Sequence, residues 1–334
     1  SVVEYSRGVL IFTFVIFIYA FISTGMLNRL LSRNITEPLE EMIRVLRHVR
    51  RGRFNERVQV VSNDEIGYTG DVINEMTQGL REGEDLRRSL VLAREVQQNL
   101  LPLKKPEFPG LDIAGISLYC DETGGDYYDF LDSGSSETGV VRIVMGDVSG
   151  HGVSSALLMA TARAFLRQRV DMGGDPAEVV SDVNRQLSRD VMNSGNFMTL
   201  FYLEMDLSRK NLRWVRAGHD PAFFYDSQKD RFQELKGKGV ALGIDESFSY
   251  EENEMAGISK GSIAVLFTDG IWEAQNPVGA MFGKEALRAV VRQNAMLSAQ
   301  HIVNAVIQAH SDFQQGAKSE DDVTLIVVKI DDCK

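Results

Sequence analysis

The sequence is poor in cysteine and in positive charge, and both shortages exclude classes of protein. Its two cysteines, Cys120 and Cys333, stand far apart and have no His or Cys neighbour at metal-ligand spacing. This usage excludes a disulfide framework and a zinc site, and it is typical of a reducing cytoplasm. The formal net charge of -11 repels polyanions, so we expect no nucleic acid among the partners.

One stretch near the N-terminus lacks charge altogether. The run Gly8–Asn28 is almost wholly apolar, and as a helix rising ~1.5 Å per residue it would span roughly 30 Å, the thickness of the hydrocarbon layer. It is too long for a signal-peptide core and no small-residue cleavage site follows, so we predict one transmembrane helix over residues 8–28. Arginines crowd the C-terminal flank, which places that side in the cytoplasm: Arg29, Arg33, Arg44, Arg47, Arg50, Arg51 and Arg53. The first residue is Ser and the segment before the span is short, so we expect a longer receptor with an external sensor.

Two amphipathic segments follow the predicted span. The first begins near Pro38 and stops at Gly52, the second opens at Asp64 and Glu65, and both repeat apolar residues at alternating three- and four-residue steps. The repeating residues are Leu39, Met42, Leu46 and Val49, then Ile66, Thr69, Ile73, Met76 and Leu80. With Ile35, Gly67, Asn74 and Glu75, residues 29–83 resemble a HAMP domain. The resemblance implies a parallel four-helix bundle built by two chains, hence a homodimer; two helices packed on their own domain remain the alternative.

A further helical stretch leads out of this region. The apolar register slips around Gly83, resumes at Leu86 and continues until Pro102 ends the helix. We predict a helical coiled-coil linker over residues 84–102. Because such a slip changes the winding of a supercoil, we expect the linker to transmit rotation or tightening to the domain that follows.

From Leu111 onward, short apolar strands alternate with helical blocks. The predicted strands are Ile113–Tyr119, Val140–Val148, Met198–Asp206, Leu212–Ala217, Ser262–Thr268 and Val323–Ile330, and the predicted helices are Ser154–Arg169, Pro176–Met192, Lys284–Asn294 and Ala299–Phe313. Strand pairs beside long helices favour an α+β fold over a parallel wound sheet. In the first helix we expect an apolar face to be buried, namely Leu157, Leu158, Ala162 and Phe165.

Acidic side chains stand beside glycine at the ends of several predicted strands. Singly, an Asp-Gly pair is more often a turn than a ligand. Gathered in one pocket, however, two carboxylates ~5 Å apart would repel by ~3 kcal/mol at an effective dielectric constant near 20, so a cation must lie among them. Hard oxygen donors select Mg²⁺ or Mn²⁺, and a pair of such ions bridged by a carboxylate is typical of phosphoryl hydrolysis. The candidate catalytic residues are Asp126, Asp147, Asp269 and Asp321.

The motifs around these acids carry a specific resemblance. They are Gln97-Gln98-Asn99-Leu100-Leu101-Pro102, Gly124-Gly125-Asp126-Tyr127-Tyr128-Asp129, Gly146-Asp147-Val148-Ser149-Gly150-His151-Gly152, Phe197-Met198-Thr199-Leu200-Phe201, Ala217-Gly218-His219-Asp220-Pro221, Thr268-Asp269-Gly270 and Asp321-Asp322-Val323-Thr324. Residues 95–331 resemble the SpoIIE-type branch of the PPM phosphatases, the bacterial stress-response and sporulation phosphatases related to protein phosphatase 2C. The resemblance implies a PPM-type β-sandwich flanked by helices over residues 103–334, on the cytoplasmic side of the bacterial inner membrane.

The resemblance also implies two divalent metal ions, Mn²⁺ or Mg²⁺, as cofactors. Asp147 would bridge the two ions, and the Val148 carbonyl would help to hold one of them. Asp269 and Asp321 would complete the shell of the second ion, with Asp126 near the first. Asp322 could exchange roles with Asp321, because the sequence does not say which of the two adjacent carboxylates points inward.

Two histidines and three departures from the family pattern qualify this assignment. His151 and His219 have the right chemistry for a general acid, but their places in a glycine turn and at a strand end favour structural hydrogen bonds. Asp220 stands where the family commonly has Asn, and Ala241 and Ala280 replace frequent Pro and Glu. None of the three removes a proposed metal ligand.

The branch resemblance implies a serine/threonine phosphatase acting on a phosphorylated partner, a small STAS-type anti-sigma-factor antagonist. A catalytically inactive scaffold of the same fold is the alternative, and the intact acid set argues against it. A diguanylate cyclase is disfavoured because Gly124-Gly125-Asp126 is followed by Tyr-Tyr rather than Glu-Phe, and a histidine kinase because no His lies in the linker helix.

Overall fold

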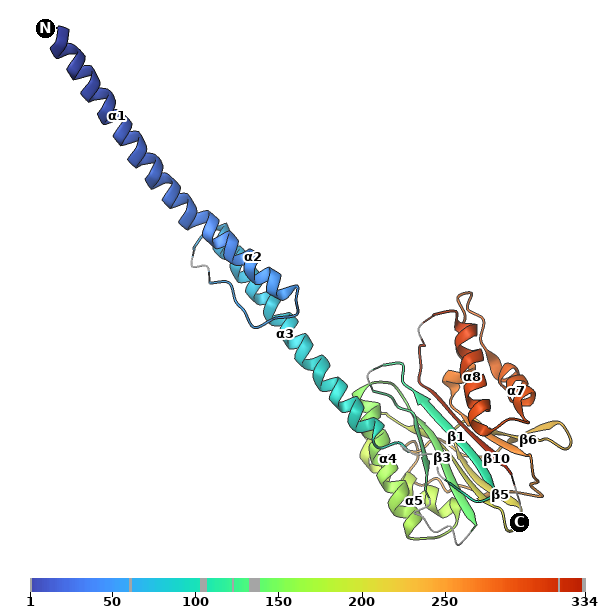
Figure 1. The fold of residues 1–334 in the computed structure, drawn as a ribbon. Helices are drawn as coiled ribbons and strands as arrows, with labels where there is room; N and C mark the ends of the chain where they lie inside the picture. The colour runs from blue at the N-terminus through green and yellow to red at the C-terminus, as the bar shows by residue number, and fades with distance from the viewer. Residues whose placement is uncertain are drawn as a thin grey trace. The chain divides into compact units, whose positions relative to one another are not determined.

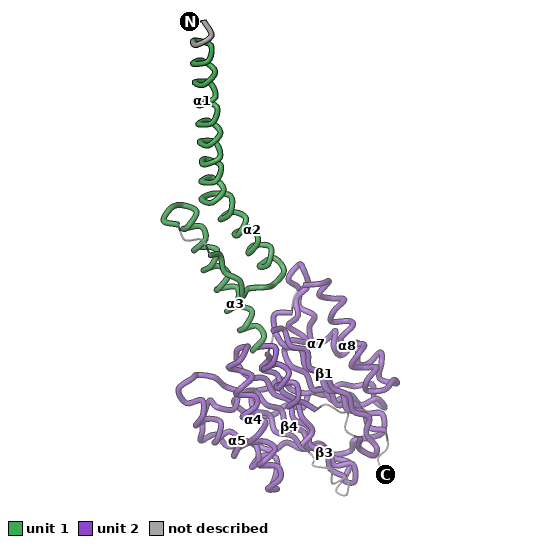
Figure 2. Tube along the Cα trace, turned by 60° about the vertical axis from the view of Figure 1, so that its left-hand side comes forward, with its two compact units in different colours: residues 1–89 green, residues 90–334 purple. Residues whose placement is uncertain are grey.

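The computed structural model describes residues 2–59, 62–102, 107–121, 123–131, 139–317 and 319–331, with side chains from residue 5 onward. The chain forms two compact units, Ser1–Ser89 and Leu90–Lys334 (Figure 2).

The first unit begins with a long apolar helix. Helix α1 (Val2–Leu31) passes through a wider π-helical turn, Ser32–Thr36, into α2 (Glu37–Val49). The sequence predicted a separate helix starting near Pro38, whereas the structure shows one continuous helical path. The wide turn explains the difference, since the bond from the Glu37 amide to the Ser32 carbonyl lets Pro38 enter without a donor of its own.

This helix is exposed along its apolar length. The candidate span Tyr5–Val49 has a mean hydropathy of 2.3 in its most apolar window, and none of that window is buried against the rest of the protein. The predicted segment 8–28 lies inside it. The length and apolar composition of this helix therefore suit a membrane span. A core helix of a soluble protein or a signal sequence can have the same length and composition.

The remainder of the first unit is a small helical pair. Asp64 Oδ1 accepts the amides of Ile66 and Gly67, both at 3.1 Å, and so opens α3 (Glu65–Gln98). Asn74 bonds both the amide and the carbonyl of Val58 at 2.8 and 3.0 Å, which fixes the connector against α3. A small core holds the pair together: Met42, Val45, Val58 and Ile73. Two more seam residues, Val49 and Ile66, pack partly buried against this core. Four others stay 40–47% exposed, namely Leu39, Leu46, Met76 and Leu80.

The second unit is a sandwich of two five-stranded antiparallel sheets (Figure 1). One sheet has the order β1 (Leu111–Leu118), β10 (Val323–Ile330), β9 (Ile263–Phe267), β6 (Ala222–Asp226) and β7 (Arg231–Leu235). The other has the order β2 (Tyr127–Phe130), β3 (Val140–Val148), β4 (Met198–Asp206), β5 (Asn211–Ala217) and β8 (Asn253–Ala256).

Helices cover both outer faces of the sandwich (Figure 1). Helices α4 (Val153–Asp171) and α5 (Pro176–Val191) pack on the β3–β4–β5 side, and α7 (Gly283–Asn294) and α8 (Ala299–Gln314) on the β1–β10 side. Side chains alternate along each strand, so β3 sends Ile143 and Met145 between the sheets and Val144 toward α4 and α5. The predicted α+β sandwich flanked by helices is confirmed.

The structure adds elements that the sequence did not predict. These are the short strands β2, β6, β7 and β8 and the single helical turn α6 (Asp269–Trp272). One side chain in α4 is also placed differently: Leu157 is 65% exposed, whereas Leu158 and Ala162 are buried as expected. Leu157 points away from the buried face of α4, which consists of Ser155, Leu158, Met159, Ala162 and Leu166.

Candidate active site

The topology brings the predicted acids to one edge of the sandwich. Asp126 precedes β2 and Asp147 is near the end of β3, and these strands are antiparallel neighbours. Asp269 follows β9 and Asp321 precedes β10, which are also antiparallel neighbours. The ends that carry the four carboxylates therefore meet where both sheets finish.

Asp126 is the most deeply buried of the four, at 1% exposure. Its Oδ2 accepts the Thr268 hydroxyl at 2.9 Å, which ties the two sheets together just before Asp269. Burial raises the pKa of Asp126 well above its usual value, and the charge of Asp147 raises it further. A buried carboxylate in this position favours either a proton or a nearby cation.

Asp147 and Asp269 are half-buried and line the same cavity, which has a volume of ≈120 Å³. Burial, followed by the charges of Asp269, Asp321 and Asp322, raises the pKa of Asp147 to about 8. Burial, followed by Asp321 and other carboxylates, raises the pKa of Asp269 to about 6. Among the described residues, no Lys or Arg lines this cavity. The rest of its wall is formed by Thr199, Gly218, His219, Asp220 and Trp272.

The two adjacent acids before β10 have different surroundings. Asp322 is buried, and its oxygens accept the amides of Cys120 at 2.9 Å and Gly125 at 2.8 Å. Asp321 is exposed beside a recess of ≈410 Å³, and its charge raises the pKa of both Asp147 and Asp269. The hydrogen bonds thus give Asp322 a structural task and leave Asp321 as the exposed acid of the pair, near enough for its charge to act on Asp147 and Asp269.

Gly125 lets the main chain approach Asp147 closely. A Cβ at this position would lie 2.7 Å from the Val148 carbonyl oxygen and 3.4 Å from Asp147 Oδ1. Any side chain would therefore crowd the carbonyl and carboxylate oxygens that the sequence predicted as ligands. The Val148 side chain itself is buried in the core, so its carbonyl is the part available at the site.

These donors fit hard divalent cations. Among the residues that the structure describes, no three His, Cys, Asp or Glu side chains come close enough to enclose an ion by themselves. Mg²⁺ seldom needs such a cage, since it is usually held by one or two carboxylates and keeps several waters. Asp147 and Asp269 are half-buried, their pKa values are raised, and no Lys or Arg among the described residues lines their cavity. Together with the Val148 carbonyl, these carboxylates suit a Mg²⁺ ion.

His219 is buried and serves a structural network. Its Nδ1 lies 2.8 Å from the Thr199 hydroxyl and its Nε2 lies 3.2 Å from the Phe267 carbonyl. Burial lowers the pKa of His219 to about 4, so the ring is neutral at pH 7 and holds no extra proton to donate. His151 is 79% exposed and its Nδ1 lies 3.2 Å from Asp121 Oδ2, so its structural role stays a prediction.

We expect His219 to make stability depend on acidity. The unfolded ring protonates near pH 6.5 and the folded ring only near pH 4, so the stabilisation is present above pH 6.5 and is lost as the pH falls toward 4. The free energy of unfolding of the wild type minus that of His219→Gln should fall by about 3 kcal/mol over that range. Urea unfolding of both proteins at matched pH values measures this difference; a constant difference would contradict the assignment.

The sequence reasoning gave no structural task to Gln97, near the end of α3. Its side-chain amide donates to the Gly124 carbonyl at 2.6 Å and accepts from the Gly124 amide at 3.2 Å, and it is 4% exposed. The helix end is thus bonded to the loop that carries Asp126. Its place in the entry motif was the available signal, but a glutamine in a helix gives no indication of its partner.

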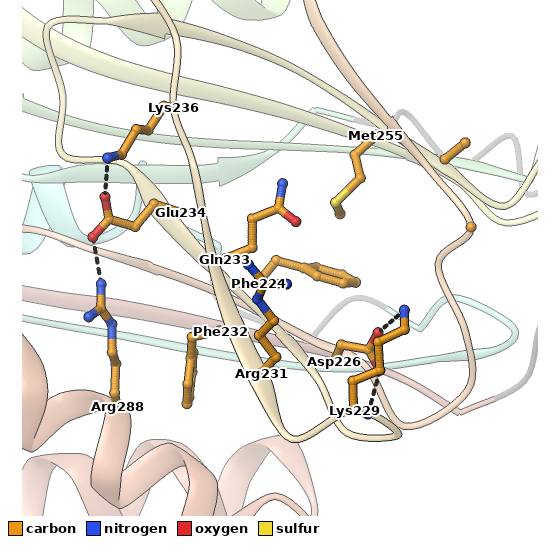
Figure 3. A pocket seen from close by; sticks show the side chains of 12 residues that line it. Phe224, Asp226, Lys229, Arg231, Phe232, Gln233, Glu234, Lys236, Met255 and Arg288 are labelled. Atoms are coloured by element: carbon orange, nitrogen blue, oxygen red, sulfur yellow. Dashed lines mark hydrogen bonds and ion pairs between the residues drawn. The ribbon is translucent and has the colours of Figure 1, made fainter.

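A larger cavity of ≈610 Å³ lies elsewhere, beside the β6–β7 hairpin (Figure 3). Its charges are largely paired with one another, as Glu234 contacts both Lys236 and Arg288 and Asp226 contacts Lys229. None of the predicted acids lines it. We assign the chemistry to the smaller cavity because it contains Asp147 and Asp269.

Comparison with known proteins agrees with this geometry. The family pattern of Stage II sporulation protein E (SpoIIE) matches residues 137–331, more than half of the chain. The chain belongs to the SpoIIE family. The HAMP domain pattern matches residues 30–82, so both predicted resemblances are confirmed, and with them the assignment to the serine/threonine phosphatases.

Individual relatives support the same assignment. Phosphoserine phosphatase RsbU of Bacillus subtilis is 29% identical over 246 residues, which cover 74% of this chain and 71% of RsbU. The chain spans about half the length of two others, Protein IcfG of Synechocystis sp. (47%) and Phosphoserine phosphatase RsbP of Bacillus subtilis (46%).

Solved structures show the fold. The SiaA-PP2C domain of Pseudomonas aeruginosa superposes with a TM-score of 0.66 at 23% identity, covering 75% of this chain and 99% of that domain. RsbX, solved in complex with magnesium, has a TM-score of 0.52 at 14% identity, covering 68% of this chain and 98% of RsbX.

Proposed function

We propose that this SpoIIE-family chain is a membrane-anchored signalling phosphatase that hydrolyses phosphoserine or phosphothreonine on a partner protein with the help of two divalent ions. One observation carries the proposal. Carboxylates from both sheets meet at one edge of the sandwich with raised pKa values, and no Lys or Arg lies among the described residues that line the cavity of Asp147 and Asp269. Such an arrangement is unfavourable without bound cations.

The proposed ligand set is the one that the family resemblance implies. Asp147 would contact both ions, with the Val148 carbonyl on the first. Asp269 and Asp321 would hold the second ion. Asp126, behind Asp147 and bonded to Thr268, would act on the first ion through water. Mn²⁺ and Mg²⁺ both suit these donors, and the magnesium complex of the RsbX relative supports that choice.

The chain's own residues prepare the site for hydrolysis. When bound, the ions would supply the positive charge that activates water and neutralises phosphate oxygens. Thr268, which donates to Asp126, and the Gly125 amide, which donates to Asp322, hold the carboxylates in place before substrate arrives. Water then replaces the seryl or threonyl oxygen on phosphorus, and inorganic phosphate leaves.

The two adjacent acids allow a direct test of this ligand set. Asp321→Asn should weaken Mn²⁺ binding by about 10- to 100-fold with little change in stability, because a ligand is lost from an exposed position. Asp322→Ala should instead lower the free energy of unfolding by about 2 kcal/mol, since the buried amide of Gly125 loses its acceptor. Mn²⁺ titration and urea unfolding separate the two effects; the reverse pattern would assign the ligand to Asp322.

The N-terminal part gives the proposed location and control. We place a transmembrane helix at 8–28, a HAMP relay at 29–83, a helical linker at 84–102 and the phosphatase domain at 103–334, with the last on the cytoplasmic side. The exposed apolar helix and the arginines after it support the anchoring. The exposed half of the HAMP seam supports a parallel homodimer, because a second chain would bury it.

The proposed substrate is a phosphorylated STAS-type anti-sigma-factor antagonist. The relatives named phosphoserine phosphatase RsbU and RsbP support a phosphoserine substrate. A small protein would also suit the exposed Leu157 and Val153 at the start of α4, which follows directly on the Asp147 loop.

Phosphate release tests the proposal. Residues 90–334 should dephosphorylate a phosphoserine STAS protein in Mn²⁺ and lose the activity in EDTA. Turnover of a generic aryl phosphate but not of the STAS protein would contradict the partner and leave the chemistry in place. Metal binding without turnover of any phosphoester would contradict the phosphatase and favour a scaffold.

A further inference from the structure

Asp269 stands on a very short element. It is the first residue of α6, which consists of only four residues, and its N-cap Thr268 makes no capping bond through its side chain. A single helical turn is not stable by itself. The direction of the Asp269 carboxylate must therefore be fixed by contacts from other parts of the fold.

The turn between β5 and β6 supplies two of these contacts, one on each side of Asp269. Before it, His219 Nε2 lies 3.2 Å from the Phe267 carbonyl. After it, Asp220 Oδ2 accepts the indole N–H of Trp272 at 2.6 Å. The adjacent residues His219 and Asp220 thus contact the chain on both sides of Asp269, at Phe267 and at Trp272.

The same turn is connected to Asp147. Thr199 lies between them, with its hydroxyl 2.8 Å from His219 Nδ1 and 3.4 Å from the Asp147 carbonyl. The contacts run from the Asp147 strand to the Asp269 turn through one short segment. The separation of the two carboxylates therefore depends on how firmly that segment is held.

Asp220 is itself held by a cation. Lys284 Nζ lies 2.8 Å from Asp220 Oδ1 and 4.4 Å from the centre of the Trp272 ring. Asp220 and Lys284 are only 23% and 31% exposed, and Asp220 and Trp272 line the cavity that contains Asp147 and Asp269. The Asp220 carboxylate thus contacts both the indole of Trp272 and the ammonium group of Lys284 at the cavity wall.

We propose that Asp220 is a positioning residue for the metal site: with Lys284 as its counter-ion, it fixes Trp272 and, through the turn of α6, the carboxylate of Asp269. This inference rests on the proposed function, in which Asp269 is a metal ligand. It gives a role to the acid at position 220, where the SpoIIE pattern led us to expect Asn.

Mn²⁺ affinity, measured on the full chain in detergent from the paramagnetic resonance signal of free Mn²⁺, tests the proposal without using activity. Asp220→Ala should weaken Mn²⁺ binding by about 10-fold or more, as loss of a group that orients a ligand does. Asp220→Asn keeps an acceptor for the indole and should recover most of that loss. Asp226→Ala is the matched control, since it removes an ion pair with Lys229 at the far end of β6 and should leave the affinity unchanged.

A double-mutant cycle gives the mechanism a second readout. Trp272→Phe removes the other partner of the bond, so it should weaken binding to a similar degree, and the double variant should be little weaker than either single one. If Asp220→Ala does not fold, the Mn²⁺ affinity of Trp272→Phe alone still tests the proposal.

Two outcomes would overturn the positioning role. They are wild-type Mn²⁺ affinity in folded Asp220→Ala or Trp272→Phe, and fully additive losses in the double variant. A wild type that binds no Mn²⁺, or that binds it equally well as Asp147→Asn, would instead overturn the proposed function and the inference with it.

Discussion

Replacing Asp147 with Asn is expected to reduce Mn²⁺-dependent phosphate release by about 10³-fold. Asp147 is the carboxylate placed to contact both ions, and the several kcal/mol of charge stabilisation that metal ions provide in the transition state corresponds to a loss of this size. The measurement is the initial rate of phosphate release from a phosphoserine protein at saturating Mn²⁺.

Stability measurements distinguish this loss from misfolding. Burial and the neighbouring carboxylates raise the pKa of Asp147 to about 8, so in the metal-free protein this group makes the folded state progressively less stable as the pH rises from about 4 to 8. Asn carries no charge, and in EDTA at pH 8 the variant should be at least as stable as the wild type. Asp182→Asn, whose carboxylate pairs with Arg169 and Arg185 and does not line the Asp147 cavity, is the matched control and should keep its activity. Retention of more than a tenth of the rate by Asp147→Asn would contradict the assignment.

Replacing Asp129 with Ala is expected to lower the free energy of unfolding by about 3 kcal/mol, because it removes the charged acceptor of the half-exposed Arg167 and leaves the buried Tyr127 hydroxyl without a partner. Asp129 is fully buried, and its two oxygens each accept a bond of 2.6 Å from Arg167. It also accepts the Tyr127 hydroxyl at 3.0 Å and lies 3.7 Å from Arg163. The cluster joins β2 to α4, which begins directly after the Asp147 loop.

Urea unfolding of residues 90–334 measures this effect. Glu246→Ala provides the matched control, since its pair with Arg189 is about half exposed on both sides and should change stability by less than about 1 kcal/mol. Equal effects of the two substitutions would show that the Asp129 cluster contributes no more than a surface pair.

Long apolar strands could be predicted from the sequence almost to the residue. Strands β3, β4 and β10 have eight or nine residues that are nearly all buried, and such runs are distinctive. Strand β2 could not be predicted, since its four residues lie in a Gly- and Asp-rich motif and become a strand only by pairing with β3. Helix α6 has a single turn, and its formation depends on contacts made by Asp220 and His310 rather than on local periodicity.

The candidate site was also predictable only in part. Asp126, Asp147 and Asp269 stand out because glycine beside an acid indicates close approach of the main chain. Asp321 and Asp322 could not be distinguished, because the decisive contact is with the Gly125 amide, 197 positions earlier in the chain. The tasks of Gln97 and Asp220 depend on partners 27 and 52 positions away in the sequence, and such contacts leave no local pattern.

Anomalous diffraction at the manganese edge from crystals of residues 90–334 grown with Mn²⁺ tests the central claim most directly. We predict two peaks, both within bonding distance of Asp147, one of them also beside the Val148 carbonyl and the other beside Asp269 and Asp321. The absence of Mn²⁺ from this edge of the sandwich, or its binding away from Asp147, would contradict the account.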